Sequence, residues 1–75
     1  MRVLVIDKDG TLRAYEIDEV IYDNYHKELW CENEDLAIIT EIQDISEGNE
    51  MVEKIYEEGK LNITKYFSEI SIKTI

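Results

Sequence analysis

Short runs of β-branched and aromatic residues, separated by turn-forming residues, limit most strongly how this chain can fold. In residues 28–32, Leu29 and Cys31 fall on one face and Trp30 on the other, and in 36–45 the even-numbered apolar residues share a face. An alternation with a period of two is typical of strands that bury one face. The runs that predict strands in this way are 3–6, 11–22, 28–32, 36–45 and 70–73.

The first two runs are joined by Lys8-Asp9-Gly10, which predicts a β-hairpin. A two-residue Asp9-Gly10 turn would place Asp7 opposite Leu12. A three-residue loop with Gly10 in the left-handed bulge position would instead pair Ile6 with Leu12, Leu4 with Ala14 and Arg2 with Glu16. We favour the three-residue loop, because it gathers apolar residues on one face and a slip of one residue would turn them to the wrong face.

One segment has the pattern of a helix. Residues 46–49 offer N-cap candidates, and Gly59 is a C-terminal stop. A helix of about ten residues needs tertiary packing to persist. Residues 61–63 follow as a short extended piece. The residues on the apolar helical face are Met51, Val52, Ile55 and Tyr56.

The predicted order of elements is therefore β-β-β-β-α-β. We expect an α+β fold in a single domain over residues 1–75, with a small, curved antiparallel sheet of about five strands packed with one short helix. The chain has 75 residues, of which 44% are apolar, enough for one modest core.

The apolar run near the start of the chain is four residues long and ends at Asp7, too short for a secretion signal. No segment approaches the ~20 apolar residues of a membrane span. Cys31 is the only cysteine, so no disulfide can form within the chain. We expect a cytoplasmic protein that makes no contact with membranes.

Negative charge is concentrated in the middle of the chain. The whole sequence carries −10, but residues 16–58 hold fifteen acidic residues against two lysines, a net charge of −13. Both flanking segments are slightly basic. Such a segment repels nucleic acid and anionic membranes and attracts a basic surface, although charged solvent faces also serve solubility alone.

Residues 3–12, read as Val-Leu-Val-Ile-Asp-Lys-Asp-Gly-Thr-Leu, resemble the first motif of the haloacid dehalogenase-like phosphatases. The resemblance implies Asp7 as nucleophile and Asp9 as general acid, with magnesium holding the phosphate. It covers ten residues of the chain. The family's parallel sheet with crossover helices does not fit a sequence in which Thr11 begins a returning strand.

The same stretch resembles an EF-hand calcium loop, with Asp7, Asp9, Gly10 and Glu16 at ligand or turn positions of that motif. Val5 stands where the first carboxylate belongs, and the four residues before it leave no room for the incoming helix. The hairpin accounts for the same residues by backbone geometry, and we favour it.

No enzymatic activity, metal or cofactor is expected. His26 is the only histidine, and with Cys31 alone it cannot complete a usual zinc site, so we expect it to lie exposed in a turn. Aromatic residues such as these fill small cores or anchor interfaces. Those that lie close together in the sequence are Tyr15, Tyr22, Tyr25 and Trp30. Tyr25, between Asn24 and His26, is the one we expect to be exposed.

We therefore expect a small acidic protein-binding module. Its partner would be a basic protein, for instance a nucleic-acid-binding protein whose groove the carboxylates occupy in place of phosphates, as small inhibitors from phages and mobile elements often do. Direct binding to nucleic acid is not expected. The candidate binding residues are Tyr25, Glu28, Glu32, Glu34, Asp35, Asp44, Glu47, Glu50, Glu53, Glu57 and Glu58.

Two alternatives stay open. The first is a structural module that associates through strand edges or through the apolar end of the chain at Ile70, Ile72 and Ile75. The second, more distant, is phosphatase-like use of Asp7 and Asp9. The oligomeric state is open.

Overall fold

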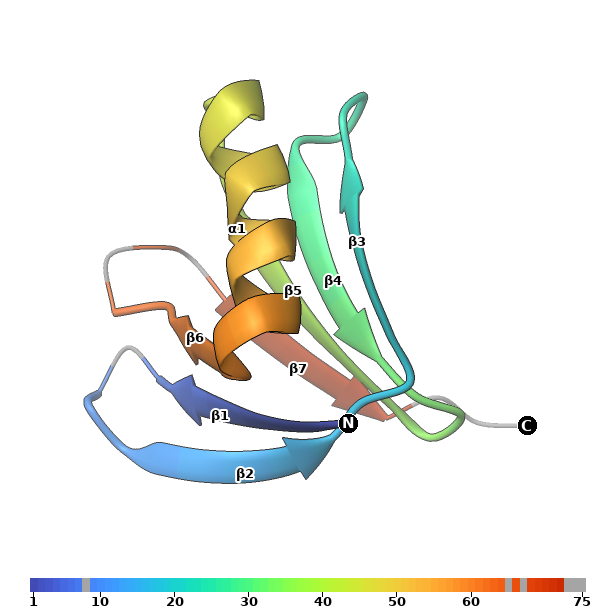
Figure 1. Ribbon diagram of the computed structural model, residues 1–75, viewed down its shortest axis with the longest axis vertical. Coiled ribbons are helices and arrows are strands. Elements are labelled where there is room, and N and C mark those ends of the chain that lie inside the picture. Colours follow the sequence, from blue (N-terminus) through green and yellow to red (C-terminus); the bar gives the residue numbers. More distant parts are fainter. Residues whose placement is uncertain (8, 65, 67, 73–75) are drawn as a thin grey trace.

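The computed structural model describes residues 1–7, 9–64, 66 and 68–72, the last segment by its backbone alone. These residues form seven strands and one helix, arranged in two sheets (Figure 1). The α+β class is confirmed. The elements are β1 (Arg2–Ile6), β2 (Leu12–Glu16), β3 (Glu19–Asp23), β4 (Glu28–Glu32), β5 (Leu36–Glu41), α1 (Ile45–Glu58), β6 (Lys60–Asn62) and β7 (Ser68–Ile72).

The strands are divided between a three-stranded sheet, in the order β2-β1-β6, and a four-stranded sheet, in the order β3-β4-β5-β7. Neighbouring strands are antiparallel except for β1 and β6, which are parallel. The expectation of one sheet with about five strands is wrong in this respect. The short extended piece at 61–63 overlaps β6, which supplies the parallel edge.

The run at 11–22 is divided between the two sheets at Ile17 and Asp18. The Ile17 N–H donates to the carbonyl of Met1 at 2.8 Å, whereas the Asp18 N–H donates to the carbonyl of Glu32 at 2.9 Å. Consecutive residues are thus bonded to different sheets. Ile17 is fully buried between them, which explains why one apolar run became two strands.

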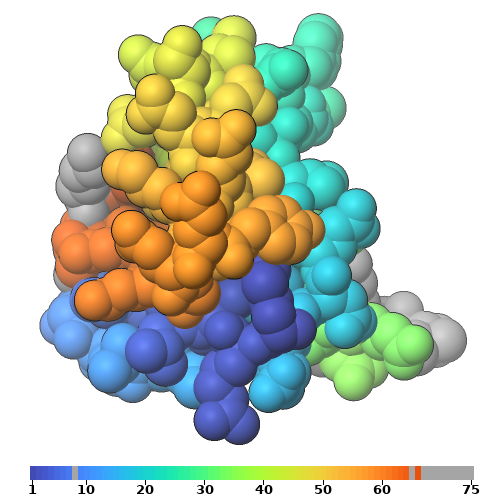
Figure 2. All heavy atoms as spheres, in the orientation of Figure 1, coloured from blue at the N-terminus to red at the C-terminus, as the bar shows by residue number. Residues whose placement is uncertain are grey.

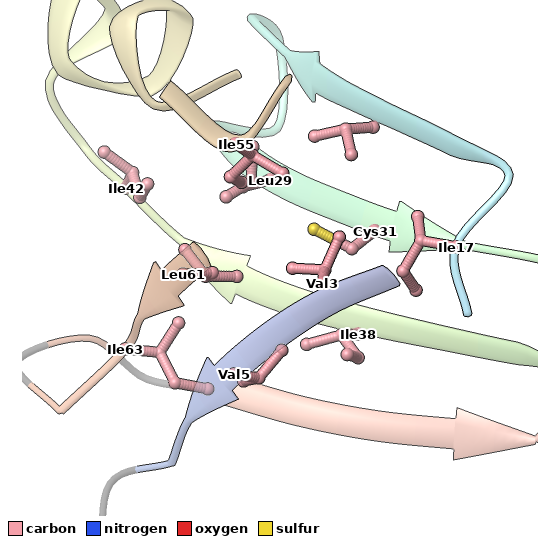
Figure 3. Packing of buried hydrophobic residues seen from close by; sticks show 11 residues of the cluster. Val3, Val5, Ile17, Leu29, Cys31, Ile38, Ile42, Ile55, Leu61 and Ile63 are labelled. Carbon is pink, nitrogen blue, oxygen red and sulfur yellow. The ribbon is translucent and has the colours of Figure 1, made fainter. Parts of the chain in front are cut away.

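Both sheets and the helix share one core (Figure 3). Val3 and Val5 of β1 meet Leu29 and Cys31 of β4 and Ile55 of α1, and all five are fully buried. Each buried aliphatic side chain of this size contributes about 1.5–3 kcal/mol. Burial raises the pKa of the Cys31 thiol to about 12, so this cysteine stays protonated at neutral pH and acts as a core residue.

The predicted hairpin register is confirmed, with Ile6 opposite Leu12 and Arg2 opposite Glu16. Gly10 has φ +84°, as the three-residue loop requires. The apolar face that this register gathers is nevertheless the outer one, since Leu4 and Leu12 are 37% and 58% exposed. All of residues 3–6 are apolar, so the pattern could not decide which alternate pair turns inward.

The helix is longer than expected and begins earlier. Asp44, not a residue of 46–49, is the N-cap, and its carboxylate accepts the Glu47 N–H at 3.0 Å. Gly59 ends the helix as predicted, with φ +66° and its N–H bonded to the Ile55 carbonyl at 2.8 Å. Among the described residues, no helix has the length and apolar character needed to cross a membrane.

The helix lies against β3 at Gly48. A Cβ atom added to Gly48 would lie 2.2 Å from the nearest ring carbon of Tyr22. Tyr22 is half-buried and its hydroxyl donates to the Ile42 carbonyl, so its ring is held at both ends. Glycine at position 48 is therefore required by the close approach of the helix to the sheet.

We predict that Gly48→Ala lowers the free energy of unfolding by about 1–3 kcal/mol, because the new methyl group displaces the Tyr22 ring. Helix propensity alone would change the stability by about 1 kcal/mol in the opposite direction. Urea denaturation followed by circular dichroism measures the difference. Ser46→Ala, at an exposed position of the same helical turn, is the control and should change stability by less than about 0.5 kcal/mol. A Gly48→Ala variant more stable than the parent would contradict the packing.

Candidate protein-binding surface

The four-stranded sheet has an inner face that packs in the core and an outer face directed away from α1. The strands alternate regularly: Val20, Leu29, Cys31, Ile38 and Thr40 point inward and are buried. Their neighbours along β3, β4 and β5 point outward. The outward residues are Glu19, Ile21 and Asp23 on β3, Glu28, Trp30 and Glu32 on β4, and Ala37, Ile39 and Glu41 on β5, of which Ala37 is nevertheless buried.

An apolar row crosses the middle of this outer face. Ile21 lies directly opposite Trp30, and Trp30 lies directly opposite Ile39. Ile21 is 41% exposed, and Trp30 and Ile39 are half-buried. Cross-strand partners of this kind have Cβ atoms about 4.5–5.5 Å apart, so the three side chains form a continuous strip.

Acidic residues border the strip on both sides. Glu19 lies opposite Glu32 on one side, and Glu28 lies between Asp23 and Glu41 on the other. No lysine or arginine occurs in β3, β4 or β5. We call the apolar row and its two acidic borders the acidic sheet face; its residues are Glu19, Ile21, Asp23, Glu28, Trp30, Glu32, Ile39 and Glu41.

Like charges directly opposite each other on neighbouring strands destabilise a sheet, and cross-strand pairs contribute on the order of 0.2–1 kcal/mol. The acidic borders therefore cost stability that oppositely charged or neutral residues would not cost. A positively charged partner would reduce this repulsion.

We predict that Glu41→Lys raises the free energy of unfolding by about 0.2–1 kcal/mol, because it replaces a repulsive pair with Glu28 by an attractive one. Thermal and urea unfolding at low salt measure the change. Glu34→Lys, at an exposed turn position, makes the same change in net charge without a cross-strand partner and is the control. Equal stabilisation by both variants would show that net charge, not the pair, is responsible.

The turn between β3 and β4 is organised by Asp23. One carboxylate oxygen accepts the N–H groups of Tyr25 at 2.9 Å and His26 at 3.1 Å, and the other lies 2.7 Å from Nδ1 of His26. Among the described residues, Asp23, His26 and Glu28 offer three possible metal-ligand atoms within 4.8 Å of one another. Both carboxylate oxygens of Asp23 are already engaged by Tyr25 and His26, so these contacts stabilise the turn. We call the contacts between Asp23 and His26 the clamp. His26 is exposed, as expected.

The clamp shifts the pKa values of both Asp23 and His26. The hydrogen bond and charge of Asp23 raise the pKa of His26 above its ordinary value of 6.5. The hydrogen bond from His26 in turn lowers the pKa of Asp23 below 3.8. The stabilisation of the folded state by charged His26 is complete below pH 6.5 and is lost as the pH rises through the raised pKa of His26. The stabilisation by charged Asp23 is lost as the pH falls through the lowered pKa of Asp23. The pair is therefore strongest between about pH 4 and 6.5.

We predict that Asp23→Asn lowers the pKa of His26 toward 6.5, because asparagine keeps the acceptor for the two backbone N–H groups but removes the charge. Titration of the imidazole proton resonances by NMR measures the shift. Asp35→Asn, which removes a carboxylate from the other end of β4, should leave the His26 titration unchanged. A His26 pKa that does not respond to Asp23→Asn would contradict the clamp.

Five of the candidate binding residues lie on or beside the β3–β4 and β4–β5 connections. Glu28 and Glu32 belong to the acidic sheet face. Tyr25, at the tip of the β3–β4 turn, is 86% exposed, in line with the expectation for this residue. Glu34 and Asp35 are exposed in the β4–β5 turn, at the other end of β4.

The remaining six candidates lie on or next to α1, which forms the upper front of the molecule in Figure 2. Asp44 is the N-cap, and Glu47 accepts a hydrogen bond from the Tyr66 hydroxyl. The other four, Glu50, Glu53, Glu57 and Glu58, are exposed. Since α1 packs on the inner side of the four-stranded sheet, these glutamates and the acidic sheet face point in opposite directions.

Six members of the acidic sheet face were not among the candidates: Glu19, Ile21, Asp23, Trp30, Ile39 and Glu41. The signal that identifies them is the alternation within β3, β4 and β5, since each stands next to an inward-pointing residue. Trp30 was identified only as part of an aromatic group. Tyr15 and Tyr22 of that group pack against the core.

The hairpin loop that resembles the phosphatase and calcium motifs is stabilised by contacts within the hairpin. Asp9 accepts the Thr11 N–H at 2.9 Å, a bond that lowers the pKa of the Asp9 carboxyl. The carboxylate of Asp7 lies 3.4 Å from Nε of Arg13. The chain after the loop returns as β2, antiparallel to β1, whereas the phosphatase family continues into a crossover helix.

A hollow of about 270 Å³ lies between α1 and the residues Asn62, Thr64 and Tyr66. It is lined mainly by polar side chains of mixed charge, among them Glu50, Lys54, Asn62 and Thr64. Because this lining carries both signs of charge, it favours no single class of ligand. The acidic sheet face is the more distinctive surface.

Comparison with protein-family models, with curated proteins and with solved structures gives no match to this chain.

Proposed function

We propose that this chain is a small acidic protein-binding module whose acidic sheet face docks on a basic protein surface. One form of this function is inhibition: the chain would present carboxylates where a nucleic acid presents phosphates, and would compete with the nucleic acid for its binding protein. The observation that carries it is the pairing of carboxylates across neighbouring strands, Glu19 with Glu32 and Glu28 with Asp23 and Glu41, around an exposed apolar strip.

This arrangement has the parts that a specific interface needs. An apolar and aromatic centre supplies contact energy, and a charged border selects the partner and accelerates association. The centre is Ile21, Trp30 and Ile39, and each border carries at least two carboxylates. A surface that served solubility alone would gain nothing from an apolar strip 41% exposed at Ile21.

The test compares two variants with the same change in net charge. Glu19→Gln/Glu28→Gln/Glu41→Gln neutralises the acidic sheet face, and Glu50→Gln/Glu53→Gln/Glu57→Gln neutralises three exposed residues of α1. Each protein is immobilised and exposed to a lysate of the source cells at low salt and at about 1 M salt, where exposed charges are screened. Captured proteins are quantified by mass spectrometry.

We expect the parent and the helix variant to capture the same basic proteins, and the sheet variant to capture them at least about tenfold less, which corresponds to about 1.4 kcal/mol. Capture should fall steeply at high salt. A captured partner that binds DNA or RNA should release it when the parent chain is added. Loss of capture in the helix variant alone, or capture unaffected by salt, would contradict the proposal.

A second candidate is a module that assembles with copies of itself. The observation that favours it is the outer face of the three-stranded sheet, where Leu12 is 58% and Leu4 37% exposed beside β2, an edge strand. The side chains of Ile70 and Ile72, and all of Ile75, lie outside the described residues. Light scattering on the same parent sample separates the two functions, since a homo-oligomer that Leu12→Lys dissociates would favour assembly.

A further inference from the structure

We propose that β2 pairs with β2 of a second copy of this chain, antiparallel and about a two-fold axis at Ala14. The two three-stranded sheets then form one continuous sheet, with the two β2 strands at its centre. This inference rests on the second candidate function and deepens it, since it specifies the strand, the orientation and the register of the assembly. The acidic sheet face belongs to the other sheet and takes no part in the pairing.

The hydrogen-bonding phase of β1 and β2 directs alternate backbone groups of β2 away from the sheet. Ile17 exchanges hydrogen bonds with Met1 at one end of the pair, and at the other end the Asp7 N–H donates to the Thr11 carbonyl at 3.0 Å. Bonded pairs recur at every second residue of an antiparallel ladder, so the odd-numbered residues of β2 bond to β1. The N–H and C=O groups that point outward belong to Leu12, Ala14 and Glu16.

The other side of β1 has the complementary phase. The Leu4 N–H donates to the Gly59 carbonyl at 2.8 Å, and the Ile6 carbonyl accepts the Ile63 N–H at 2.9 Å. The even-numbered residues of β1 therefore bond on the side of β6, and its odd-numbered residues bond to β2. Both sides of β1 thus assign the same outward groups to β2.

These outward groups are open to a partner. The even-numbered residues of β2 are exposed, and β2 is the last strand on its side of the sheet (Figure 1). Within the described part of the chain, one hydrogen bond reaches the outward groups, from the Asn33 side-chain amide to the Glu16 carbonyl at 2.6 Å. The edge at β3 differs, because its Val20 N–H donates to the Tyr56 hydroxyl at 3.2 Å.

The charges of β2 do not oppose the approach of a second copy. Nε of Arg13 lies 3.4 Å from the Asp7 carboxylate, and the Glu16 carboxylate lies 3.4 Å from Nε of Arg2. A chain with a net charge of −10 repels its own copies most where carboxylates gather. β2 carries one basic and one acidic residue, each paired within the chain, so two copies meet here with little repulsion.

The register centred on Ala14 satisfies most of the outward groups. The Ala14 N–H of each copy donates to the Ala14 carbonyl of the other, and the Glu16 N–H of each donates to the other's Leu12 carbonyl. None of these bonds needs the Glu16 carbonyl, which the Asn33 amide already engages. Residues 12–16 of the two copies pair along their full length.

The two neighbouring registers with the same hydrogen-bonding phase are less favourable. Pairing centred on Arg13 sets this side chain directly opposite its copy, and like charges in that position destabilise a sheet. Pairing centred on Tyr15 makes the Ala14 N–H depend on the Glu16 carbonyl, which is already engaged. Charge and hydrogen bonding therefore select the same axis.

Pairing in this register also covers apolar surface. Leu12 and Leu4 are 58% and 37% exposed on the outer face, and Leu4 lies directly opposite Ala14. Diagonal neighbours across an antiparallel pair are about 7–8 Å apart, within reach of a long side chain, so Leu12 contacts the copy's Ala14. The apolar side chains of the two outer faces thus join into one strip.

A cysteine at position 14 tests the axis directly. Ala14→Cys places two thiols in a bonded antiparallel pair, whose Cα atoms lie about 5.5 Å apart, inside the range of about 4.4–6.8 Å that a disulfide spans. Leu12→Cys is the matched control, because it lies on the same outer face of β2 but about 13 Å from its own copy in this register. The native Cys31 is fully buried, and the parent chain measures its background.

We expect Ala14→Cys, treated with oxidised glutathione, to form a disulfide-linked dimer on non-reducing gels at least about tenfold more than Leu12→Cys or the parent. Light scattering should show a parent dimer whose fraction rises with protein concentration.

Ala14→Pro tests the hydrogen bonds. Proline is tolerated at an edge-strand position whose N–H faces solvent, so the monomer should fold, which circular dichroism checks. The variant loses both central hydrogen bonds of the pair, and the dissociation constant of the dimer should rise at least about tenfold. Ala14→Ser keeps the N–H and a small side chain, and should dimerise like the parent. If Ala14→Pro does not fold, the cysteine variants decide.

A parent chain that stays monomeric at every concentration would overturn the β2 pairing, as would equal crosslinking at positions 12 and 14. A dimer that a folded Ala14→Pro variant leaves intact would overturn it as well, and would keep assembly through another surface. The capture experiment is independent of these outcomes, because the sheet variant changes residues of β3, β4 and β5 alone. Docking on a basic partner and pairing through β2 can therefore fail separately.

Discussion

The mutual hydrogen bonds between Met1 and Ile17 hold together the point at which the chain passes from one sheet to the other. The Ile17 N–H donates to the Met1 carbonyl at 2.8 Å, and the terminal amine of Met1 donates to the Ile17 carbonyl at 2.7 Å. Ile17 is fully buried at this junction. Because the sheets meet there, one face of each is committed to the shared core, and the acidic sheet face is left outside.

The acidic residues of the middle segment do not form one surface. Several are occupied by local structure: Asp23 holds the β3–β4 turn, Asp44 caps α1, and Glu16 pairs with Arg2 at 3.4 Å. The exposed glutamates of α1 form a second group on the other side of the four-stranded sheet. Among the described residues, the acidic sheet face combines carboxylates with an apolar row that is 41% exposed at Ile21, and on this combination we base the proposal of a binding surface.

The two outer faces also differ in charge. On the three-stranded sheet, Leu4 is flanked across the strands by Ala14 and Lys60, and Arg2 lies further along β1. On β3, β4 and β5 of the four-stranded sheet, the charged residues that border the apolar strip are all acidic. The uneven distribution of charge along the sequence thus becomes a difference between the two sheets, because β1, β2 and β6 include Arg2, Arg13 and Lys60, whereas β3, β4 and β5 include no basic residue.

The sequence by itself determined the α+β class, the hairpin register, the stop at Gly59 and the exposed position of Tyr25. These follow from local rules: alternation, a left-handed glycine and turn-forming residues act over a few positions. Only the tertiary structure decided that residues 11–22 divide between two sheets, that Val3 and Val5 rather than Leu4 and Ile6 are buried, and that Ile21, Trp30 and Ile39 meet in one row. Those outcomes depend on contacts between segments distant in the chain, and an alternating pattern is the same whichever of its faces is covered.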